Sequence, residues 1–340
     1  MNPRNLQLFN LLPEFKKLIP WTQLISTPTP VHKLDSISKK WGNSQIFTKR
    51  EDKTDEINYG GNKVRNLEFI LADVINHNKQ DVLSIVPYGS NFAAALSSQS
   101  KKLNLNVILS QFVVEKNPQV IAHDFYCQSQ GAKAYNYPGK ISAPIAAVDA
   151  CSRFLYSQII NDRSYWVAAG GSSAYGALGH VEALLELKHQ VENGELPQPD
   201  YIILGAGTCG TIAGLNVGVK LAGWNTKIIG VRAADSIICN KIRIAQLTNQ
   251  VFKLLNVNYQ ITTNEIYLME SPNNKGYGYP TESAQDIINE FYEEEKIILD
   301  STYTSKVILY LKDQLLNYEF TEKNILYWHT YSPKAYSFNN

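Results

Sequence analysis

The sequence predicts an α/β protein in which parallel sheets are wrapped by helices. Short runs rich in β-branched residues alternate with longer segments of helical periodicity, the pattern of strands joined by crossover helices. The chain has 340 residues, which exceeds the length that a single hydrophobic core usually supports. Two lobes with a cleft between them are therefore expected. Hydrophobic residues make up 44% of the chain and charged residues 19%, which indicates a globular protein with a full core.

Strands are predicted where short apolar runs are bounded by polar or turn residues. In chain order they are Gln45–Lys49, Val82–Val86, Val107–Phe112, Trp166–Ala169, Tyr201–Leu204, Lys227–Val231 and Ile325–Trp328. Helices are predicted where apolar residues recur three and four positions apart. They are Val64–Asn76, Phe92–Leu103, Ile145–Asn161, Ala177–Asn193, Thr211–Leu221, Ser283–Glu295 and Lys306–Leu316.

The composition argues against several classes of partner. The net charge is +1 and no window clusters Lys and Arg, so nucleic acid is not expected as a partner. No apolar stretch suits a signal peptide or a membrane span. The four cysteines lie far apart, with neither the spacing of a zinc site nor that of a disulfide framework. No metal is therefore expected, and the predicted location is the cytoplasm.

The first segment with chemical content is Tyr59–Glu68, where Gly60 and Gly61 form a tight turn ahead of Lys63 at the start of a helix. Most lysines at such a position are solvated. A lysine that forms a Schiff base must be partly buried, and paired glycines let backbone and cofactor approach closely. Lys63 is therefore a candidate covalent anchor.

The second segment is Leu204–Gly214, a glycine-rich loop between an apolar strand and a helix. Its backbone N–H groups and helix N-terminus favour an anion, with Thr208 and Thr211 as hydroxyl donors, so a phosphate seat is predicted. The loop also satisfies G-x-G-x-x-G, and Asp235 follows the next strand, which leaves a nicotinamide-dependent oxidoreductase open. A tight turn that binds nothing is a third interpretation.

Two further loops, Gly276–Glu282 and Leu299–Lys306, lead into helices and carry hydroxyl side chains. Catalytic residues are often found on loops of this kind.

Together the four segments resemble the family of 1-aminocyclopropane-1-carboxylate deaminase and D-cysteine desulfhydrase. These are pyridoxal-phosphate enzymes with the two-domain tryptophan-synthase-β-like fold (fold type II). The resemblance extends over 28–328 and includes Thr48–Asp52 and the stretch 169–179. The order and spacing of these blocks are more specific than any one of them.

The resemblance implies pyridoxal 5′-phosphate as cofactor, a small amino acid as substrate and a homodimer. It also implies a larger cofactor-binding domain of residues 1–65 and 173–340, with a smaller domain of residues 66–172 inserted between its parts. The catalytic residues it implies are Lys63 as the Schiff-base lysine, Ser90 facing the substrate, and the tyrosines Tyr277 and Tyr303. The cofactor contacts it implies are Lys63, Asn91 at the 3′ oxygen, Thr304 beside the pyridine nitrogen, and the phosphate loop Gly207, Thr208, Cys209, Gly210 and Thr211.

Thr304 bears on the type of reaction, because the deaminase carries glutamate at this place and the desulfhydrase carries threonine. A hydroxyl leaves the ring nitrogen closer to neutral than a carboxylate would, and the weaker electron sink favours prompt loss of a β leaving group. A lyase or deaminase is therefore predicted, in which Lys63 removes the α proton and a β group is eliminated. Ring opening, β-replacement and a non-catalytic protein that retains the cofactor stay open.

The chain departs from the family pattern on the substrate side. Tyr88 and Phe92 flank Ser90–Asn91, and Tyr331 follows Thr330 where the family usually has glycine. These changes add bulk where substrate is expected, so an altered specificity is predicted. Among other candidates, His180 is expected to be structural, Cys209 a tolerated small residue, and His329 either a packing or a catalytic residue.

Overall fold

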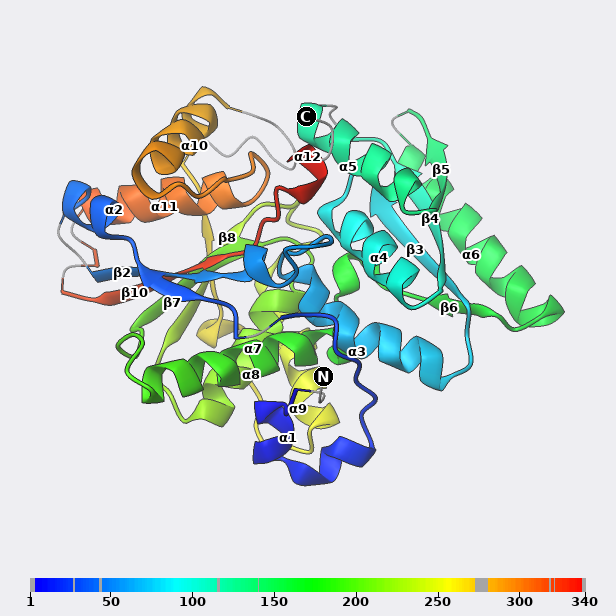
Figure 1. Ribbon diagram of the computed structural model, residues 1–340, viewed down its shortest axis with the longest axis horizontal. Helices are drawn as coiled ribbons and strands as arrows, with labels where there is room; N and C mark the ends of the chain where they lie inside the picture. The colour runs from blue at the N-terminus through cyan, green and yellow to red at the C-terminus, as the bar shows by residue number, and fades with distance from the viewer. Residues whose placement is uncertain are drawn as a thin grey trace.

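The computed structural model describes residues 4–26, 28–42, 45–114, 117–139, 141–272, 281–317, 319–320 and 322–337. Within these residues the chain forms a six-stranded sheet of order β1-β2-β10-β7-β8-β9 and a four-stranded sheet of order β5-β4-β3-β6. The strands of the smaller sheet lie between β2 and β7 in the sequence. The chain therefore leaves the first sheet, builds the second, and returns (Figure 1).

The strands are β1 Val31–Lys33, β2 Gln45–Arg50, β3 Asp81–Pro87, β4 Asn106–Phe112, β5 Lys133–Tyr137, β6 Ser164–Trp166, β7 Tyr201–Ala206, β8 Lys227–Arg232, β9 Tyr267–Glu270 and β10 Asn324–His329. The helices are α1 Gln7–Leu11, α2 Asp35–Lys40, α3 Lys63–Asn76, α4 Asn91–Lys102, α5 Pro118–Ser129, α6 Ser142–Ile160, α7 Ala174–Glu192, α8 Gly210–Ala222, α9 Lys241–Leu254, α10 Glu282–Glu295, α11 Thr304–Leu316 and α12 Lys334–Ser337. Short 3-10 turns connect some of them, including Glu51–Lys53 and Ala169–Gly171.

Both sheets are parallel apart from β1, which pairs antiparallel with β2. Strand β10 lies between β2 and β7, so the C-terminal part of the chain completes the centre of the larger sheet. Parallel strands covered on both faces read as continuous apolar runs, and β7 and β10 follow this rule. Helices α7, α8 and α9 cover one face of the larger sheet, and α2, α10 and α11 cover the other (Figure 1).

The smaller sheet has helix α6 on one face and α4 on the other, with α5 packed against α4. Helix α3 packs against both α4 and α7, so it lies between the two sheets. Each lobe thus has its own apolar core, and α3 joins them. None of the helices within the described ranges is long and apolar enough to cross a membrane.

The predicted helices and strands correspond to observed ones with one clear error. The predicted strand Trp166–Ala169 is wrong in its position: the strand is Ser164–Trp166, and Ala169–Gly171 is a 3-10 turn. Gly170 and Gly171 have φ values of +67° and +65°, a left-handed conformation that ends extended structure.

Helices α5 and α9 were not predicted, although both carry start signals. Asn117 caps α5 and is followed by Pro118, and the side chain of Asn240 accepts a hydrogen bond at the start of α9. Strands β1, β5 and β9 were also missed; they lie at or near sheet edges and are short, so their apolar patterns are weak.

Candidate active site

A cavity of about 800 Å³ opens between the two sheets. The carboxyl ends of parallel strands meet there, which is where ligands bind in open α/β folds. Its walls come from the larger sheet on one side and from the smaller sheet and the C-terminal segment on the other. The residues on these walls that matter most for the chemistry are Lys63, Ser90, Asn91, Phe92, Gly207, Thr208, Cys209, Gly210, Thr211, Tyr303 and Tyr331.

Lys63 is the first residue of α3, and its half-buried side chain lies on the cavity wall. The turn before it is tight: a Cβ added to Gly60 would lie 2.8 Å from the backbone oxygen of Asp52. Burial lowers the pKa of the Lys63 amine to about 8, against a small opposing effect of Cys209. An amine with this pKa has a substantial neutral fraction near neutral pH, as a nucleophile or base requires.

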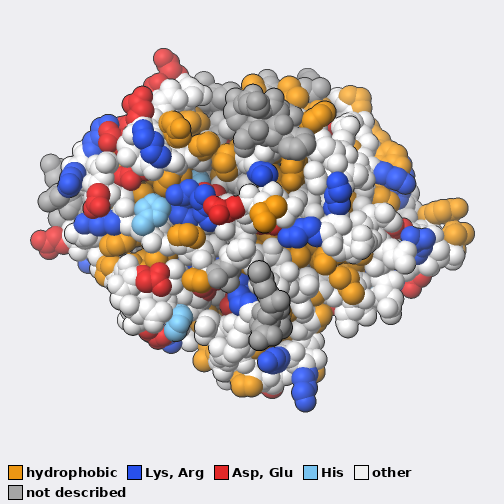
Figure 2. All heavy atoms as spheres, viewed as in Figure 1, with side chains coloured by type: hydrophobic (Ala, Val, Ile, Leu, Met, Phe, Trp, Pro, Cys, Tyr) orange, Lys and Arg blue, Asp and Glu red, His pale blue; other side chains and the backbone are white. Residues whose placement is uncertain are grey.

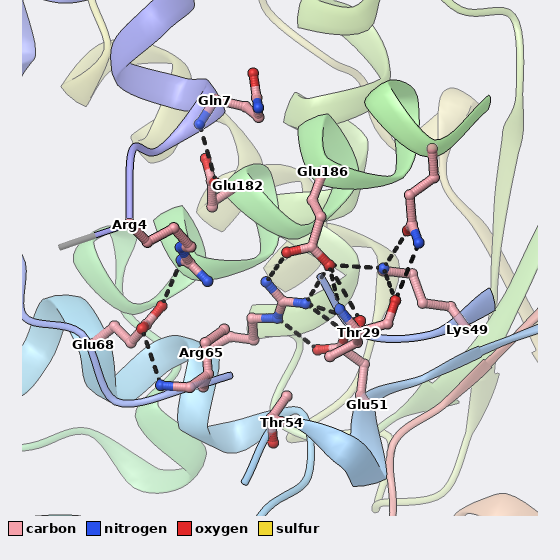
Figure 3. Close-up of polar contacts among 12 residues, drawn as sticks. Arg4, Gln7, Thr29, Lys49, Glu51, Thr54, Arg65, Glu68, Glu182 and Glu186 are labelled. Carbon is pink, nitrogen blue, oxygen red and sulfur yellow. Dashed lines mark hydrogen bonds and ion pairs between the residues drawn. The ribbon is translucent and has the colours of Figure 1, made fainter. Parts of the chain in front are cut away.

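The first turn of α3 is anchored by a buried ion network around Arg65 (Figure 3). The Arg65 guanidinium donates to Glu51 at 2.8 and 2.9 Å and to Glu186 at 2.9 and 3.0 Å. Lys49 donates to the same Glu186 carboxylate at 2.8 Å. Burial raises the pKa of Glu186, but the charges of Arg65 and Lys49 outweigh it and hold the pKa well below its usual range. The network joins β2, α3 and α7 and fixes the backbone that carries Lys63.

The predicted phosphate loop connects β7 to α8. Cys209 precedes the helix with φ of +73°, a left-handed conformation that turns successive backbone N–H groups toward one side. Together with the N-terminus of α8, this geometry favours an anion. The ring of Tyr303 lies against the loop, because a Cβ added to Gly207 would be 2.9 Å from its Cε1.

The hydroxyl of Thr211 is oriented by its neighbours. Asn62 donates from Nδ2 to Thr211 Oγ1 at 2.8 Å, and His180 Nε2 lies 3.2 Å from the same oxygen. Asn66 donates from Nδ2 to the Gly171 backbone oxygen, so its Oδ1 must accept the hydrogen on His180 Nε2, 2.9 Å away. Burial lowers the pKa of His180 well below its usual range, so the ring is neutral.

Thr211 Oγ1 therefore accepts, and its own hydrogen is available to a ligand. Thr208 is prepared in the same way, since Ser172 Oγ donates to Thr208 Oγ1 at 2.6 Å and accepts from the Gly210 backbone N–H at 3.2 Å. Two hydroxyl hydrogens thus remain for an anion at the N-terminus of α8. The residues present fit a phosphate group at this place.

The cavity wall opposite the phosphate loop includes the N-terminus of α4. Ser90 is the N-cap of this helix and accepts from the backbone N–H groups of Phe92 and Ala93, which leaves its hydroxyl hydrogen to donate. Asn91 Oδ1 accepts from the Tyr59 hydroxyl at 3.4 Å. Both residues line the cavity, as the resemblance implies, whereas Tyr88 does not.

Thr304 lies just outside the cavity wall. Its hydroxyl donates to Asp300 Oδ1 at 2.6 Å and accepts from the Asp300 backbone N–H at 2.7 Å. Asp300 itself lines the cavity. The predicted residue Tyr277 lies outside the residues that the structure describes.

The predicted histidines have packing contacts. His329 is buried outside the cavity lining; its Nδ1 lies 2.8 Å from the Tyr327 hydroxyl, and burial lowers its pKa to about 4. His180, expected to be structural, contacts the phosphate-loop residue Thr211. Cys209 is a buried part of the cavity wall.

Some cavity residues were not assigned by the sequence analysis. Tyr59 lines the cavity and is 1% exposed. Arg243 lines it from α9, the helix whose start signal at Asn240 was overlooked. A cation at this position favours an anionic ligand near the phosphate loop.

A half-buried amine of lowered pKa lies beside an anion-binding loop in a cavity between two α/β lobes, the arrangement expected of an enzyme that uses a phosphorylated cofactor. Residues 22–330 match the family model "Pyridoxal-phosphate dependent enzyme", and the chain belongs to this family. It is a pyridoxal-phosphate-dependent enzyme of the lyase and deaminase kind. The predicted family, fold class and cofactor are thereby confirmed, whereas the roles of individual site residues and the domain boundaries stay predictions.

Two relatives cover nearly the whole chain. D-cysteine desulfhydrase of Salmonella newport (strain SL254) is 28% identical over 317 residues, 92% of this chain and 93% of that protein. The crystal structure of an ACC deaminase homologue superimposes with a TM-score of 0.82 at 27% identity, covering 97% of this chain and 95% of the other. A fungal L-serine ammonia-lyase from Rhizomucor miehei, at 18% identity and a TM-score of 0.62, shares the fold.

Proposed function

We propose that Lys63 binds pyridoxal phosphate covalently, and that the enzyme removes the α proton of a small amino acid and expels a β substituent. The observation that carries the proposal is the Lys63 amine, with its pKa of about 8, on the wall of a cavity that also contains the phosphate loop. No described side chain forms a hydrogen bond or ion pair with this amine, which leaves it available to react.

The side chains have distinct roles in this proposal. The hydroxyl hydrogens of Thr208 and Thr211 and the backbone N–H groups at the start of α8 hold the phosphate. Asn91 would hold the 3′ oxygen of the cofactor through its amide, and Ser90 would donate to the substrate. When bound, pyridoxal phosphate delocalises the electron pair left at the substrate's α carbon. The Lys63 amine would accept the α proton of the substrate.

The contacts of Thr304 support elimination. Its hydroxyl hydrogen is donated to the Asp300 carboxylate, so this hydroxyl does not supply a proton to the nitrogen of a pyridine ring. A ring nitrogen without a proton donor is a weaker electron sink, which favours prompt departure of a good β leaving group. D-cysteine desulfhydrase is a relative named for a substrate of this kind.

The substrate side of the cavity supports an altered specificity. Phe92 and Tyr331 both line the cavity, and they are 3% and 2% exposed. Their rings narrow the space for substrate, which favours a substrate with a small side chain.

The net charge of +1 is in keeping with a small-molecule substrate rather than nucleic acid. The cysteines form no disulfide among the described residues, which is in keeping with a reducing cytoplasm.

The test begins with the absorbance of the purified protein, in which a lysine-bound cofactor gives a visible band. A panel of D- and L-amino acids is then added, and 2-oxo acid, ammonia and sulfide are measured. Release of a 2-oxo acid with the β substituent supports the proposal, and Lys63→Ala is the matched control. A colourless protein, or a spectrum that no amino acid changes, would contradict the proposal. If ring opening of 1-aminocyclopropane-1-carboxylate is the fastest reaction, the enzyme is a ring-opening deaminase and the proposed β-elimination is wrong.

A further inference from the structure

Two of the four cysteines meet beside the cavity, at the turn that forms the phosphate loop. Cys209 belongs to this loop, and Cys239 lies between β8 and α9. The Cys209 Sγ atom lies 3.7 Å from the backbone oxygen of Ile238, the residue before Cys239. The Cys239 Sγ atom lies 3.4 Å from the backbone oxygen of Ala206, in the same turn as Cys209. Each thiol thus lies against the backbone that carries the other, and the two side chains form a hydrogen bond.

The four thiols differ in what can reach them. Cys209 is part of the cavity wall, whereas Cys239 is completely buried and does not line the cavity, so a small molecule that enters the cavity meets Cys209 first. Cys127 is buried on α5, and burial raises its pKa to about 12. Cys151 is exposed on α6, at the right-hand edge of the molecule, where hydrophobic side chains gather (Figure 2). These last two thiols are therefore natural references for the pair.

The surroundings of Cys209 favour its thiolate, the reactive form of a cysteine. The hydrogen bond from the Cys239 thiol lowers the pKa of Cys209, the positive charges of Arg243 and Lys63 act in the same direction, and together they outweigh burial. Cys209 also stands at the N-terminus of α8, where a negative charge is stabilised. The pKa of Cys239 is raised well above its usual range, because its hydrogen is donated to Cys209 and the thiol is buried. Cys209 is therefore the thiol that ionises, and Cys239 keeps its proton.

We propose that Cys209 and Cys239 are a modification site, a dithiol that hydrogen peroxide oxidises to a disulfide. The Cys209 sulfur attacks a peroxide oxygen: the S–O bond forms, the O–O bond breaks, and the departing hydroxide takes up the former thiol proton and leaves as water. The Cys239 sulfur then attacks the Cys209 sulfur: the S–S bond forms, the S–O bond breaks, and the second hydroxide leaves as water with the proton of Cys239. The thiols together lose two electrons and two protons, and one peroxide becomes two water molecules. Disulfides in reducing compartments, where they occur, are usually transient ones of this sensing kind.

The disulfide should disturb the phosphate loop, a consequence that rests on the proposed function of this loop. Cys209 has φ of +73° and stands between Thr208 and Gly210. Because disulfide geometry is specific, a bond to Cys239 shifts the backbone on both sides of Cys209 and misaligns the donors to phosphate. The oxidised protein should bind pyridoxal phosphate about tenfold more weakly, the effect of losing roughly one hydrogen bond to a charged group. By linkage, bound cofactor should slow formation of the disulfide.

Peptide mapping by mass spectrometry tests the modification directly. The full-length protein, with and without pyridoxal phosphate, is treated with hydrogen peroxide, its remaining thiols are alkylated, and its peptides are analysed without reduction. A peptide pair linked through Cys209 and Cys239 should appear, dithiothreitol should remove it, and pyridoxal phosphate should slow its formation. The peptide that contains Cys127 should stay a free thiol, since that thiol is buried and has a raised pKa.

Fluorescence titration of reduced and oxidised protein tests the effect on the loop. Cys239→Ala should bind pyridoxal phosphate as the reduced wild type does, and peroxide should no longer change this affinity. Cys127→Ala is the matched control: it removes another buried thiol, in the smaller lobe, and should stay sensitive to peroxide. Circular dichroism shows that each variant is folded, and the peptide map of the wild type does not depend on any variant.

Two results of the peptide map would overturn the proposal. In one, peroxide oxidises Cys209 and leaves Cys239 a free thiol; in the other, only the exposed Cys151 reacts. A linked protein that binds pyridoxal phosphate as tightly as the reduced protein would refute the effect on the phosphate loop. A protein that forms the link but binds no pyridoxal phosphate in either state would contradict the proposed function instead, and the dithiol site would stand.

Discussion

The two walls of the active-site cavity differ in how their residues are held. On the phosphate-loop wall, polar partners position each hydroxyl: Asn62 and His180 direct Thr211, and Ser172 directs Thr208. The opposite wall carries Ser90 and Asn91, and beside them the aromatic rings of Phe92 and Tyr331 are packed with little exposed surface. A cofactor seat needs fixed donors, because hydrogen bonds to phosphate depend on geometry, whereas a substrate pocket selects largely by shape. Changes on the two walls should therefore have different consequences.

The largest effect is expected at Lys63, which belongs to the first wall. Lys63→Ala should remove the visible cofactor band and lower turnover by about 10³-fold or more, since it removes both covalent anchor and base. Absorbance and product release measure the two effects. Lys306→Gln is the matched control, because burial also lowers the pKa of Lys306 to about 8 but this lysine does not line the cavity. If Lys306→Gln loses the cofactor band and Lys63→Ala keeps it, Lys306 rather than Lys63 binds the cofactor.

The double change Thr208→Ala with Thr211→Ala should weaken cofactor binding. Each lost hydrogen bond to a charged group costs about 1–3 kcal/mol, so the combined Kd for pyridoxal phosphate should rise by at least roughly 30-fold. Binding of pyridoxal, which lacks the phosphate, should change little, and fluorescence titration compares the two ligands. Thr248→Ala, which removes a buried hydroxyl bonded within α9, is the control. An equal loss for both ligands would mean that the threonines do not hold the phosphate.

The second wall is tested by Phe92→His with Tyr331→Gly. If these rings restrict the pocket, turnover of D-cysteine should increase about tenfold, the size of effect expected from a change of pocket shape. Sulfide and pyruvate release measure it, with ring opening of 1-aminocyclopropane-1-carboxylate as comparison. Both side chains are buried, so thermal unfolding must accompany the assay, because their loss leaves a void. Wild-type turnover equal to or above that of a folded variant would refute the steric interpretation.

The smallest effect concerns pH. The pKa of Lys63 is about 8, below that of an ordinary lysine, so the neutral amine increases as pH rises toward this value and levels off above it. The rate at which apoenzyme takes up pyridoxal phosphate covalently should increase about fivefold from pH 7 to pH 8 and at most about twofold beyond. Stopped-flow absorbance gives this profile. A rate that continues to climb tenfold per pH unit to pH 10 would mean that the lysine has an ordinary pKa.

The sequence was most informative where function restricts it most. The segments around Lys63 and the phosphate loop were predicted as parts of one site, and the structure brings Lys63 and Thr211 to the same cavity. The glycine-rich loop alone allowed three interpretations, and the order and spacing of the four segments made the prediction specific. Helices α5 and α9 were missed although Asn117 with Pro118 and Asn240 mark where they start. Arg243, on α9, was missed with them.

By itself, the sequence determined the α/β class, the order of the main strands and helices, the family and its cofactor, because periodicity and motif spacing are local properties of the chain. Only the tertiary structure decided which donors are free at the phosphate loop, since this depends on His180 and Ser172, which are distant from the loop in sequence. The tertiary structure also decided which face of α6 is buried. The apolar periodicity of that helix predicts its existence, but the sheet beneath accommodates Ala146 and Ala150, and so the larger side chains point outward.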